Sequence, residues 1–282
     1  MNLNETILNA KDGTALFTRT WRPDTVAIGT VCLVHGLGEH CGRYHHVADF
    51  LNRSGYTVLA FDLRGHGKSG GKRGDTPAFQ SYMDDITVLL DKARRDFPGR
   101  PRFLYGHSLG GVLVLNYALR LRPRLAGIIA TSPGLRTTFE EQHLKLSLVH
   151  LLAPLMPGLT LPNGLDVQAL SIDPQVILAY QQDDLVHDRA SLRLAKESFS
   201  AIEWAFEHAA EFSMPLLLMH GTHDRIAYSQ GSQLFASQVK SDCTLKLWEG
   251  GYHELHNEPE RAKVLQFIAD WLNNHLTLDK PD

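Results

Sequence analysis

Five residues near the middle of the chain, Gly106-His107-Ser108-Leu109-Gly110, constrain the fold most strongly. They follow an apolar segment at residues 102–105 and precede a longer one at residues 112–121. A G-x-S-x-G pattern in this context is typical of a nucleophile elbow, a sharp strand-to-helix turn in which the serine is strained and its neighbours must be small. The pattern predicts that Ser108 is a nucleophile. An ordinary glycine turn is the alternative.

Short apolar segments alternate with helical patterns along most of the chain. Continuous apolar character, typical of parallel strands buried on both faces, predicts strands at residues 30–34, 57–61, 102–105, 125–130, 216–219 and 244–248. Helical periodicity predicts helices at residues 44–52, 81–97, 109–121, 230–239 and 259–275. A turn at residues 11–13 indicates an N-terminal hairpin. We therefore expect an α/β fold with a mostly parallel central sheet, flanked by helices, that binds ligands at the carboxyl ends of its strands.

Residues 133–212 interrupt this alternation. They contain an apolar helix candidate at residues 144–152, and Pro154, Pro157 and Pro162 follow it too closely for a membrane span. We expect a core built from residues 1–132 and 213–282, with residues 133–212 inserted as a helical cap. The apolar cap residues Leu144, Leu146, Leu148, Val149, Leu151 and Leu152 are expected to face lipid or an acyl chain, and a helix that only covers the core is the alternative.

A serine nucleophile needs a histidine base and an acid that orients the base, and in this fold class the chain order is Ser, Asp or Glu, then His. Asp224 follows the expected strand at 216–219, and His253 follows the one at 244–248. Taken alone, the residue types favour a turn cap for Asp224 and a surface position for His253 over catalysis. Their succession after neighbouring strands predicts a triad of Ser108, Asp224 and His253.

Two backbone amides are expected to stabilise the oxyanion that forms when the serine attacks a carbonyl. One is the N–H of Leu109, directly after the nucleophile. The second is the N–H of Leu37, in the glycine-rich sequence His35-Gly36-Leu37-Gly38 that follows the strand at 30–34. A simple glycine turn remains the alternative for this loop.

Several other functions are excluded by charge and spacing. The net charge is −3, with 28 basic and 31 acidic residues interspersed, so we expect no nucleic-acid partner. The sequence from Gly65 to Gly70 matches G-x-G-x-x-G, but the acidic residues about 20 positions later begin a helical pattern instead of ending a strand. His253 and His256 are one residue too close for an H-E-x-x-H zinc motif. We expect neither a metal nor an organic cofactor.

The cysteines and the N-terminal residues bear on location. Cys32, Cys41 and Cys243 are odd in number and lack metal-ligand spacing, which favours reduced thiols. The first residues lack the basic and apolar regions of a signal peptide, and no apolar stretch reaches the length of a membrane span. We expect a cytoplasmic protein.

Five stretches together resemble the monoacylglycerol lipase and lysophospholipase family of α/β-hydrolases: residues 35–44, 62–69, 106–111, 221–225 and 252–256. The resemblance extends from the hairpin to the last helix and implies a serine hydrolase that cleaves a single fatty-acyl ester without a cofactor, under a cap. By matching position it implies the triad and oxyanion amides named above. It also places Glu39, Arg43 and His256 near the glycerol end of the substrate, with Glu39 and Arg43 as possible braces of the oxyanion loop.

The expected reaction is hydrolysis of monoacylglycerol to glycerol and a free fatty acid through an acyl-enzyme intermediate. A lysophospholipase or a broad carboxylesterase is the alternative within this class. A hydrolase fold without catalysis that binds an acylated ligand is the alternative from another class, and a fluorophosphonate probe separates the two because only an activated serine reacts quickly. The expected partner is a lipid ester, with transient membrane or micelle contact through the cap.

Overall fold

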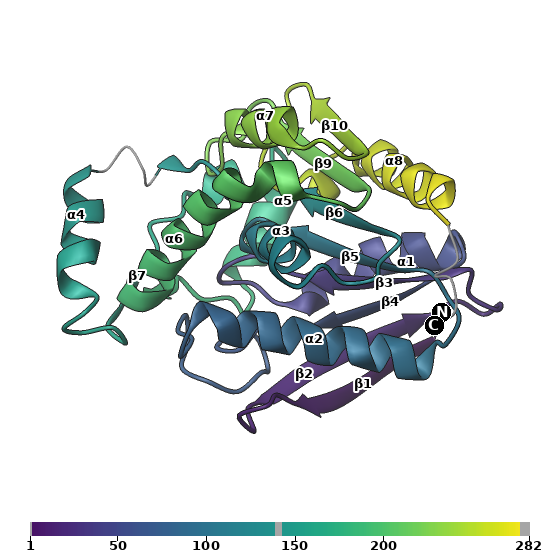
Figure 1. Ribbon diagram of the computed structural model, residues 1–282, viewed down its shortest axis with the longest axis horizontal. Coiled ribbons are helices and arrows are strands. Elements are labelled where there is room, and N and C mark those ends of the chain that lie inside the picture. The colour runs from purple at the N-terminus through teal and green to yellow at the C-terminus, as the bar shows by residue number, and fades with distance from the viewer. Residues whose placement is uncertain (1, 139–142, 277–282) are drawn as a thin grey trace.

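The computed structural model describes residues 2–138 and 143–276, and within them an eight-stranded sheet forms the centre (Figure 1). Its strand order is β1-β2-β4-β3-β5-β6-β9-β10. The pairs from β4 to β10 are parallel, whereas β1 pairs with β2 and β2 with β4 in antiparallel register. The strands are β1 (Asn2–Asn9), β2 (Ala15–Arg22), β3 (Gly29–Val34), β4 (Tyr56–Phe61), β5 (Arg102–His107), β6 (Gly127–Thr131), β9 (Leu216–Gly221) and β10 (Cys243–Trp248). The mostly parallel sheet and the N-terminal hairpin are confirmed.

Helices cover both faces of the sheet. Alternate side chains of a strand point to opposite faces, so in β5 Leu104 packs with one apolar cluster, and Phe103 and Tyr105 pack with another. The Leu104 side carries α2 (Phe79–Asp96), α3 (Leu109–Leu121) and α7 (Ser229–Gln238). The opposite side carries α1 (His45–Arg53) and α8 (Arg261–Asn274). The sheet is thus a layer between two layers of helices, as Figure 1 shows.

The expected element boundaries agree with the structure within about two residues, with one difference in burial. Helix α3 begins at Leu109 and ends at Leu121, as expected. Strand β10 was expected to be buried on both faces, and this expectation is wrong because all of its residues are only half-buried. In the described part of the chain β10 pairs with β9 alone, at the edge of the sheet, where a helix layer covers it less completely.

None of the described residues between β6 and β9 joins the central sheet, in which β6 and β9 are direct neighbours. We call residues 133–212 the cap, and these limits stay a prediction. Its described elements are α4 (His143–Leu152), β7 (Thr160–Pro162), α5 (Pro174–Gln181), β8 (Arg189–Ser191) and α6 (Leu192–His208). Strands β7 and β8 form an antiparallel pair of their own. In Figure 1, α4 stands at the end of the molecule beyond α6.

The structure describes the side chains of three of the six apolar residues expected to face lipid, and only one of these three faces solvent. Val149 and Leu152 of α4 pack with Leu192 and Ala195 of α6, so they form a small core within the cap. Leu151 instead is 68% exposed. The side chains of the remaining three, Leu144, Leu146 and Leu148, lie outside the described residues.

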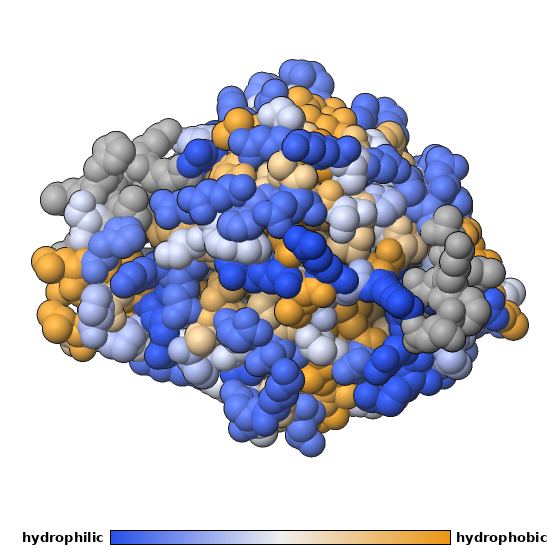
Figure 2. Space-filling view, in the orientation of Figure 1, coloured by the Kyte–Doolittle hydropathy of each residue, from blue (hydrophilic) through white to orange (hydrophobic). Residues whose placement is uncertain are grey.

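An exposed apolar patch continues from Leu151 into the turn after α4. Leu155 is 75% exposed and Met156 52% exposed. Figure 2 shows apolar surface at the end of the molecule that carries α4. None of the helices in residues 2–138 and 143–276 has the length and hydrophobicity that crossing a bilayer requires.

Candidate active site

Ser108 occupies the turn between β5 and α3 with a backbone that few non-glycine residues adopt, at φ 54° and ψ −115°. A Cβ atom on Gly106 would collide with the Gly110 carbonyl, and one on Gly110 would collide with the Val34 carbonyl. Both glycines are therefore required by close backbone approach. The Ser108 N–H donates to the Thr131 carbonyl at 3.0 Å, which holds the turn against β6.

A hydrogen-bonded chain joins three side chains from separate parts of the sequence. The Ser108 Oγ lies 2.9 Å from His253 Nε2, and His253 Nδ1 lies 2.7 Å from Asp224 Oδ2. His253 and Asp224 are both buried. In this geometry Nδ1–H donates to the carboxylate, which leaves Nε2 free to accept the serine proton. The structure thus brings together the three residues that the chain order predicted.

The loops that carry Asp224 and His253 are bound to each other. They follow β9 and β10, which are parallel neighbours, so both loops emerge at the same edge of the sheet. The Gly251 carbonyl accepts from the His223 N–H at 3.0 Å, and a Cβ atom on Gly221 would overlap that same carbonyl. This close contact fixes the distance between the acid and the base.

The electrostatics of the pair suit a base at neutral pH. Burial would raise the pKa of Asp224, but the attraction of His253 and the hydrogen bonds to the carboxylate lower it well below its usual range. Burial would likewise lower the pKa of His253, but the Asp224 carboxylate outweighs it and raises that pKa above its ordinary value. Asp224 therefore stays ionised, and His253 gains proton affinity.

Two amides expected to form the oxyanion hole lie near Ser108. The Leu109 N–H is the first of α3, so it has no acceptor within the helix. Leu37 follows Gly36, at which an added Cβ atom would lie 3.2 Å from Ser108 Cβ, so this loop passes directly beside the serine. Glu39 holds the loop, because its Oε1 accepts the Gly36 N–H at 2.7 Å.

Arg43 lies between two buried carboxylates. It donates to Glu39 Oε2 at 2.7 Å and to both oxygens of Glu254, at 2.6 and 2.7 Å. Burial would raise the pKa of Glu254, but Arg43 lowers it to about 2. Since Glu254 follows His253 in the chain, Arg43 connects the oxyanion loop to the histidine loop. The Tyr44 hydroxyl donates to Glu39 as well, at 2.8 Å.

The family resemblance indicated Glu39 and Arg43 as site residues, but two of their partners were not predicted from the sequence. Glu254 stands beside His253 within the 252–256 motif, so its position next to the base was the available signal. Tyr180 of the cap lies with its ring 4.7 Å from the Arg43 guanidinium, and no pattern in the sequence indicated this contact.

His256 is fully buried in a stack of aromatic rings. Its ring lies 4.7 Å from that of Tyr44 and 4.8 Å from that of His107, and His107 in turn lies 4.9 Å from His253. Among the described residues neither nitrogen of His256 has a hydrogen-bond partner. Burial, together with the nearby His107, lowers the pKa of His256 well below its ordinary value, so the ring is neutral.

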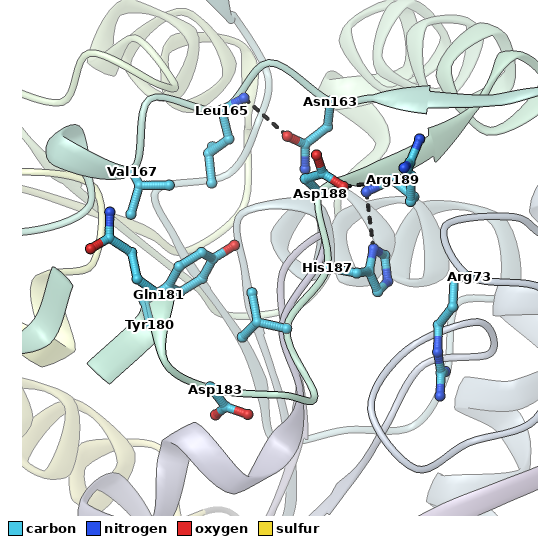
Figure 3. Close-up of a pocket in the computed structure, with 11 residues that line it drawn as sticks. Arg73, Asn163, Leu165, Val167, Tyr180, Gln181, Asp183, His187, Asp188 and Arg189 are labelled. Atoms are coloured by element: carbon cyan, nitrogen blue, oxygen red, sulfur yellow. Dashed lines mark hydrogen bonds and ion pairs between the residues drawn. The ribbon is translucent and has the colours of Figure 1, made fainter. Parts of the chain in front are cut away.

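The cap contacts both loops of the site, and an open pocket lies beside them. The Leu170 carbonyl accepts the Glu254 N–H at 2.8 Å, and the Gly38 carbonyl accepts the His187 N–H at 2.9 Å. A cavity of about 630 Å³ lies next to these contacts (Figure 3). Polar and charged side chains of the cap, among them Tyr180 and Asp183, line it together with Arg73. The apolar Leu165, Val167 and Val186 line it as well, whereas Ser108 and His253 do not.

Here a strained serine after the central strand β5 is coupled through a histidine after β10 to an acid after β9. This arrangement defines the serine hydrolases of the α/β-hydrolase fold. The chain matches the family described as "Serine aminopeptidase, S33" over residues 26–260, and it belongs to this family.

Named relatives cover almost the whole chain. A monoacylglycerol lipase of Mycolicibacterium smegmatis is 36% identical over 94% of this chain and 95% of its own length. The solved monoacylglycerol lipase of Paleococcus ferrophilus is 36% identical, with a TM-score of 0.83 over 98% of this chain and 100% of its own. An uncharacterized abhydrolase domain-containing protein of Dictyostelium discoideum is 41% identical over 95% of this chain, which spans 29% of that longer protein.

Replacing Asp224 with Asn tests the orienting acid. We expect kcat for a nitrophenyl ester to fall by roughly four decades, because an amide stabilises the wrong histidine tautomer. In the remaining activity, the midpoint of the acidic limb of the pH profile should lie at lower pH than in the native enzyme. The attraction that raises the pKa of His253 is gone, so that pKa falls. The matched control is Asp184→Asn at an exposed cap position, which should change kcat by less than about two-fold. The assignment would be contradicted if Asp184→Asn lowered kcat strongly while Asp224→Asn remained active.

Proposed function

We propose that this chain hydrolyses monoacylglycerol to glycerol and a free fatty acid, with Ser108, His253 and Asp224 as its catalytic triad. The observation that supports the proposal most strongly is the hydrogen-bonded chain of these three side chains, with the Leu37 and Leu109 amides beside the serine. The relatives named as monoacylglycerol lipases match this chain over nearly its full length, and they support the choice of substrate.

The reaction follows from the geometry of the triad. His253 Nε2 takes the proton of Ser108 as Oγ bonds to the ester carbonyl carbon, and the amides of Leu37 and Leu109 stabilise the resulting oxyanion. The imidazolium then protonates the leaving glycerol oxygen as the C–O bond breaks, which leaves the acyl group on Ser108. In the second half, His253 takes a proton from water, the hydroxide attacks the acyl carbonyl, and the fatty acid leaves as Ser108 regains its proton.

The alcohol end of the substrate is proposed to lie near Glu39, Arg43 and His256. The three hydrogen bonds on Glu39 and the two carboxylates on Arg43 give these residues a bracing role beside the oxyanion loop. The neutral ring of His256 stacks on Tyr44, whose hydroxyl binds Glu39, and these uncharged rings suit an uncharged polyol. A choline phosphate would require a partner for its buried phosphate and an aromatic face for its ammonium group.

The pocket in Figure 3 is proposed as the path by which glycerol leaves. Its Tyr180 wall stacks on Arg43, and its His187 binds Gly38, next to the oxyanion residue Leu37. Charged side chains of both signs line it, including Arg73 and Asp183. These charged groups suit a hydrated polyol, and the apolar side chains of Leu165, Val167 and Val186 line the rest of the pocket.

We further propose that the cap touches membranes or micelles through its exposed apolar patch, Leu151, Leu155 and Met156. Apolar side chains that face water gain free energy when they enter a lipid surface, at about 0.025 kcal/mol for each Å² of apolar area. Such contact would bring the enzyme to the surface where its substrate resides.

A cytoplasmic location is also proposed. Cys32, Cys41 and Cys243 are free thiols, and burial raises the pKa of all three, so none is an activated thiolate. Thiols in this form persist in a reducing compartment.

The head-group preference tests the proposed substrate. We expect kcat/KM to favour monoacylglycerol over lysophosphatidylcholine of equal chain length by about ten- to a hundred-fold, the scale of one or two mismatched polar contacts. His256→Phe keeps the stacked ring but removes both nitrogens, so it should erode this preference more than it slows a nitrophenyl ester. A better rate with lysophosphatidylcholine would instead favour the lysophospholipase alternative.

The membrane patch is tested by Leu151→Ser combined with Leu155→Ser. We expect weaker co-sedimentation with phosphatidylcholine vesicles and a lower rate on vesicle-borne long-chain substrate, with an unchanged rate on a soluble short-chain ester, because both side chains face water. The matched control is Val26→Ser, since Val26 is 77% exposed but lies outside the cap. Equal losses on both substrates, or an equal effect of the control, would refute the contact.

A further inference from the structure

His220, at the end of β9, is bonded to the same oxygen of Asp224 that holds His253. Its Nε2 lies 3.1 Å from Asp224 Oδ2 and 2.8 Å from the Ala227 carbonyl oxygen. Its Nδ1 lies 2.8 Å from the Ser232 hydroxyl of α7. His220 and Ser232 are fully buried. The hydrogen-bonded chain therefore continues beyond the acid into the interior of the protein.

The partners of His220 determine which of its nitrogens carries the proton. An ionised carboxylate and a carbonyl both face Nε2, and neither can donate, so Nε2 must carry the hydrogen. Nδ1 shares a hydrogen bond with the Ser232 hydroxyl. His220 is thus a donor, through Nε2, to the acid of the triad.

The four hydrogen bonds to Asp224 divide evenly between its two oxygens. Oδ1 accepts the backbone N–H groups of Ile226 and Ala227, at 2.8 and 3.0 Å. Oδ2 accepts His253 Nδ1 and His220 Nε2. The backbone donors fix one edge of the carboxylate, and His220 is the side chain that holds the other edge where His253 binds.

We propose that His220 is a positioning residue for the reaction: its Nε2–H fixes Asp224 Oδ2 toward His253 and draws part of the carboxylate charge away from it. The proposal rests on the triad assigned under the proposed function. Without this donor, Oδ2 attracts the protonated His253 more strongly and the carboxylate is held by fewer bonds. His220 thereby adjusts the proton affinity of the base as well as its orientation.

Other groups also act on His253, and they stay unchanged when His220 is replaced. Asp224, Glu254, Glu39 and His107 act on His253 through charge or ring contact. From the elements packed against His220, α7 contributes Ser232 and β10 contributes Leu247, its neighbour in the sheet. Asp224 is therefore the group through which a change at His220 reaches the base.

Two variants separate a donor role from a packing role. His220→Phe keeps a ring of similar size and removes the donor. His220→Gln removes the ring but retains an amide N–H that can reach the carboxylate. The control is Asn52→Leu, because the buried Asn52 amide also donates to two carbonyls, those of Trp21 and Tyr56, and contacts none of the triad residues through them.

For His220→Phe we expect kcat on nitrophenyl butyrate to fall by about ten- to a hundred-fold at unchanged KM, the scale of one hydrogen bond to a charged group. The acidic limb of kcat/KM against pH should move to higher pH, because the pKa of His253 rises when Oδ2 loses a competing donor. Fluorophosphonate labelling of Ser108 should slow in parallel. His220→Gln should restore most of the rate and the native limb, and Asn52→Leu should lower Tm without changing the rate per folded molecule.

The proposal would be overturned if folded His220→Phe kept the native kcat and the native acidic limb of the pH profile. Equal losses of kcat in the Phe and Gln variants would also overturn it, because they would indicate a packing role alone. A third measurement needs no variant: the ¹⁵N shifts of histidine in the native protein should show that Nε2 of His220 carries a hydrogen at pH 7, and a tautomer with hydrogen on Nδ1 alone would refute the donor role. Failure of the native enzyme to label with fluorophosphonate would count against the triad itself, whereas the tautomer of His220 is measured independently of catalysis.

Discussion

The strained backbone of Ser108 is the constraint on which the rest of the site depends. A residue at φ 54° and ψ −115° costs on the order of 1–3 kcal/mol, so the surrounding structure must hold it there. Its N–H is bound by Thr131, and its carbonyl accepts from Val112 and Gly134. Strand β5 lies between β3 and β6 in the middle of the sheet, which gives these bonds a rigid frame. The strain turns Oγ toward His253, and beside it lies the first amide of α3, which has no acceptor within the helix.

The other half of the site depends on two parallel strands that end at the same edge. Strands β9 and β10 bring Asp224 and His253 to that edge, and Gly221 at the end of β9 and Gly251 after β10 let their loops touch. Arg43 then joins the histidine loop to the oxyanion loop through Glu254 and Glu39. Base, acid and oxyanion amides are thus held by one connected set of bonds, which is the pre-organisation that lowers a reaction barrier.

Much of the fold could be predicted because buried parallel strands are continuously apolar and helices are not. Helix α3 was predicted residue for residue, and the order of Ser108, Asp224 and His253 along the strands predicted which side chains meet. Contacts without a local pattern were not predictable. Arg43 and Glu254 are 211 positions apart, and the role of His220 depends on where α7 places Ser232. The half-burial of β10 follows from its place at the sheet edge, which the sequence does not encode locally.

The central claim, that Ser108 attacks the ester and carries the acyl group, is tested most directly by trapping the intermediate. The enzyme is mixed with a nitrophenyl ester, quenched in acid within milliseconds and analysed by peptide mass spectrometry. The account predicts a burst of about one nitrophenol per enzyme and an acyl adduct on the peptide that contains Ser108. In folded Ser108→Ala the adduct should be absent and kcat should fall by about six decades. An adduct on another residue, or near-native turnover by Ser108→Ala, would contradict the account.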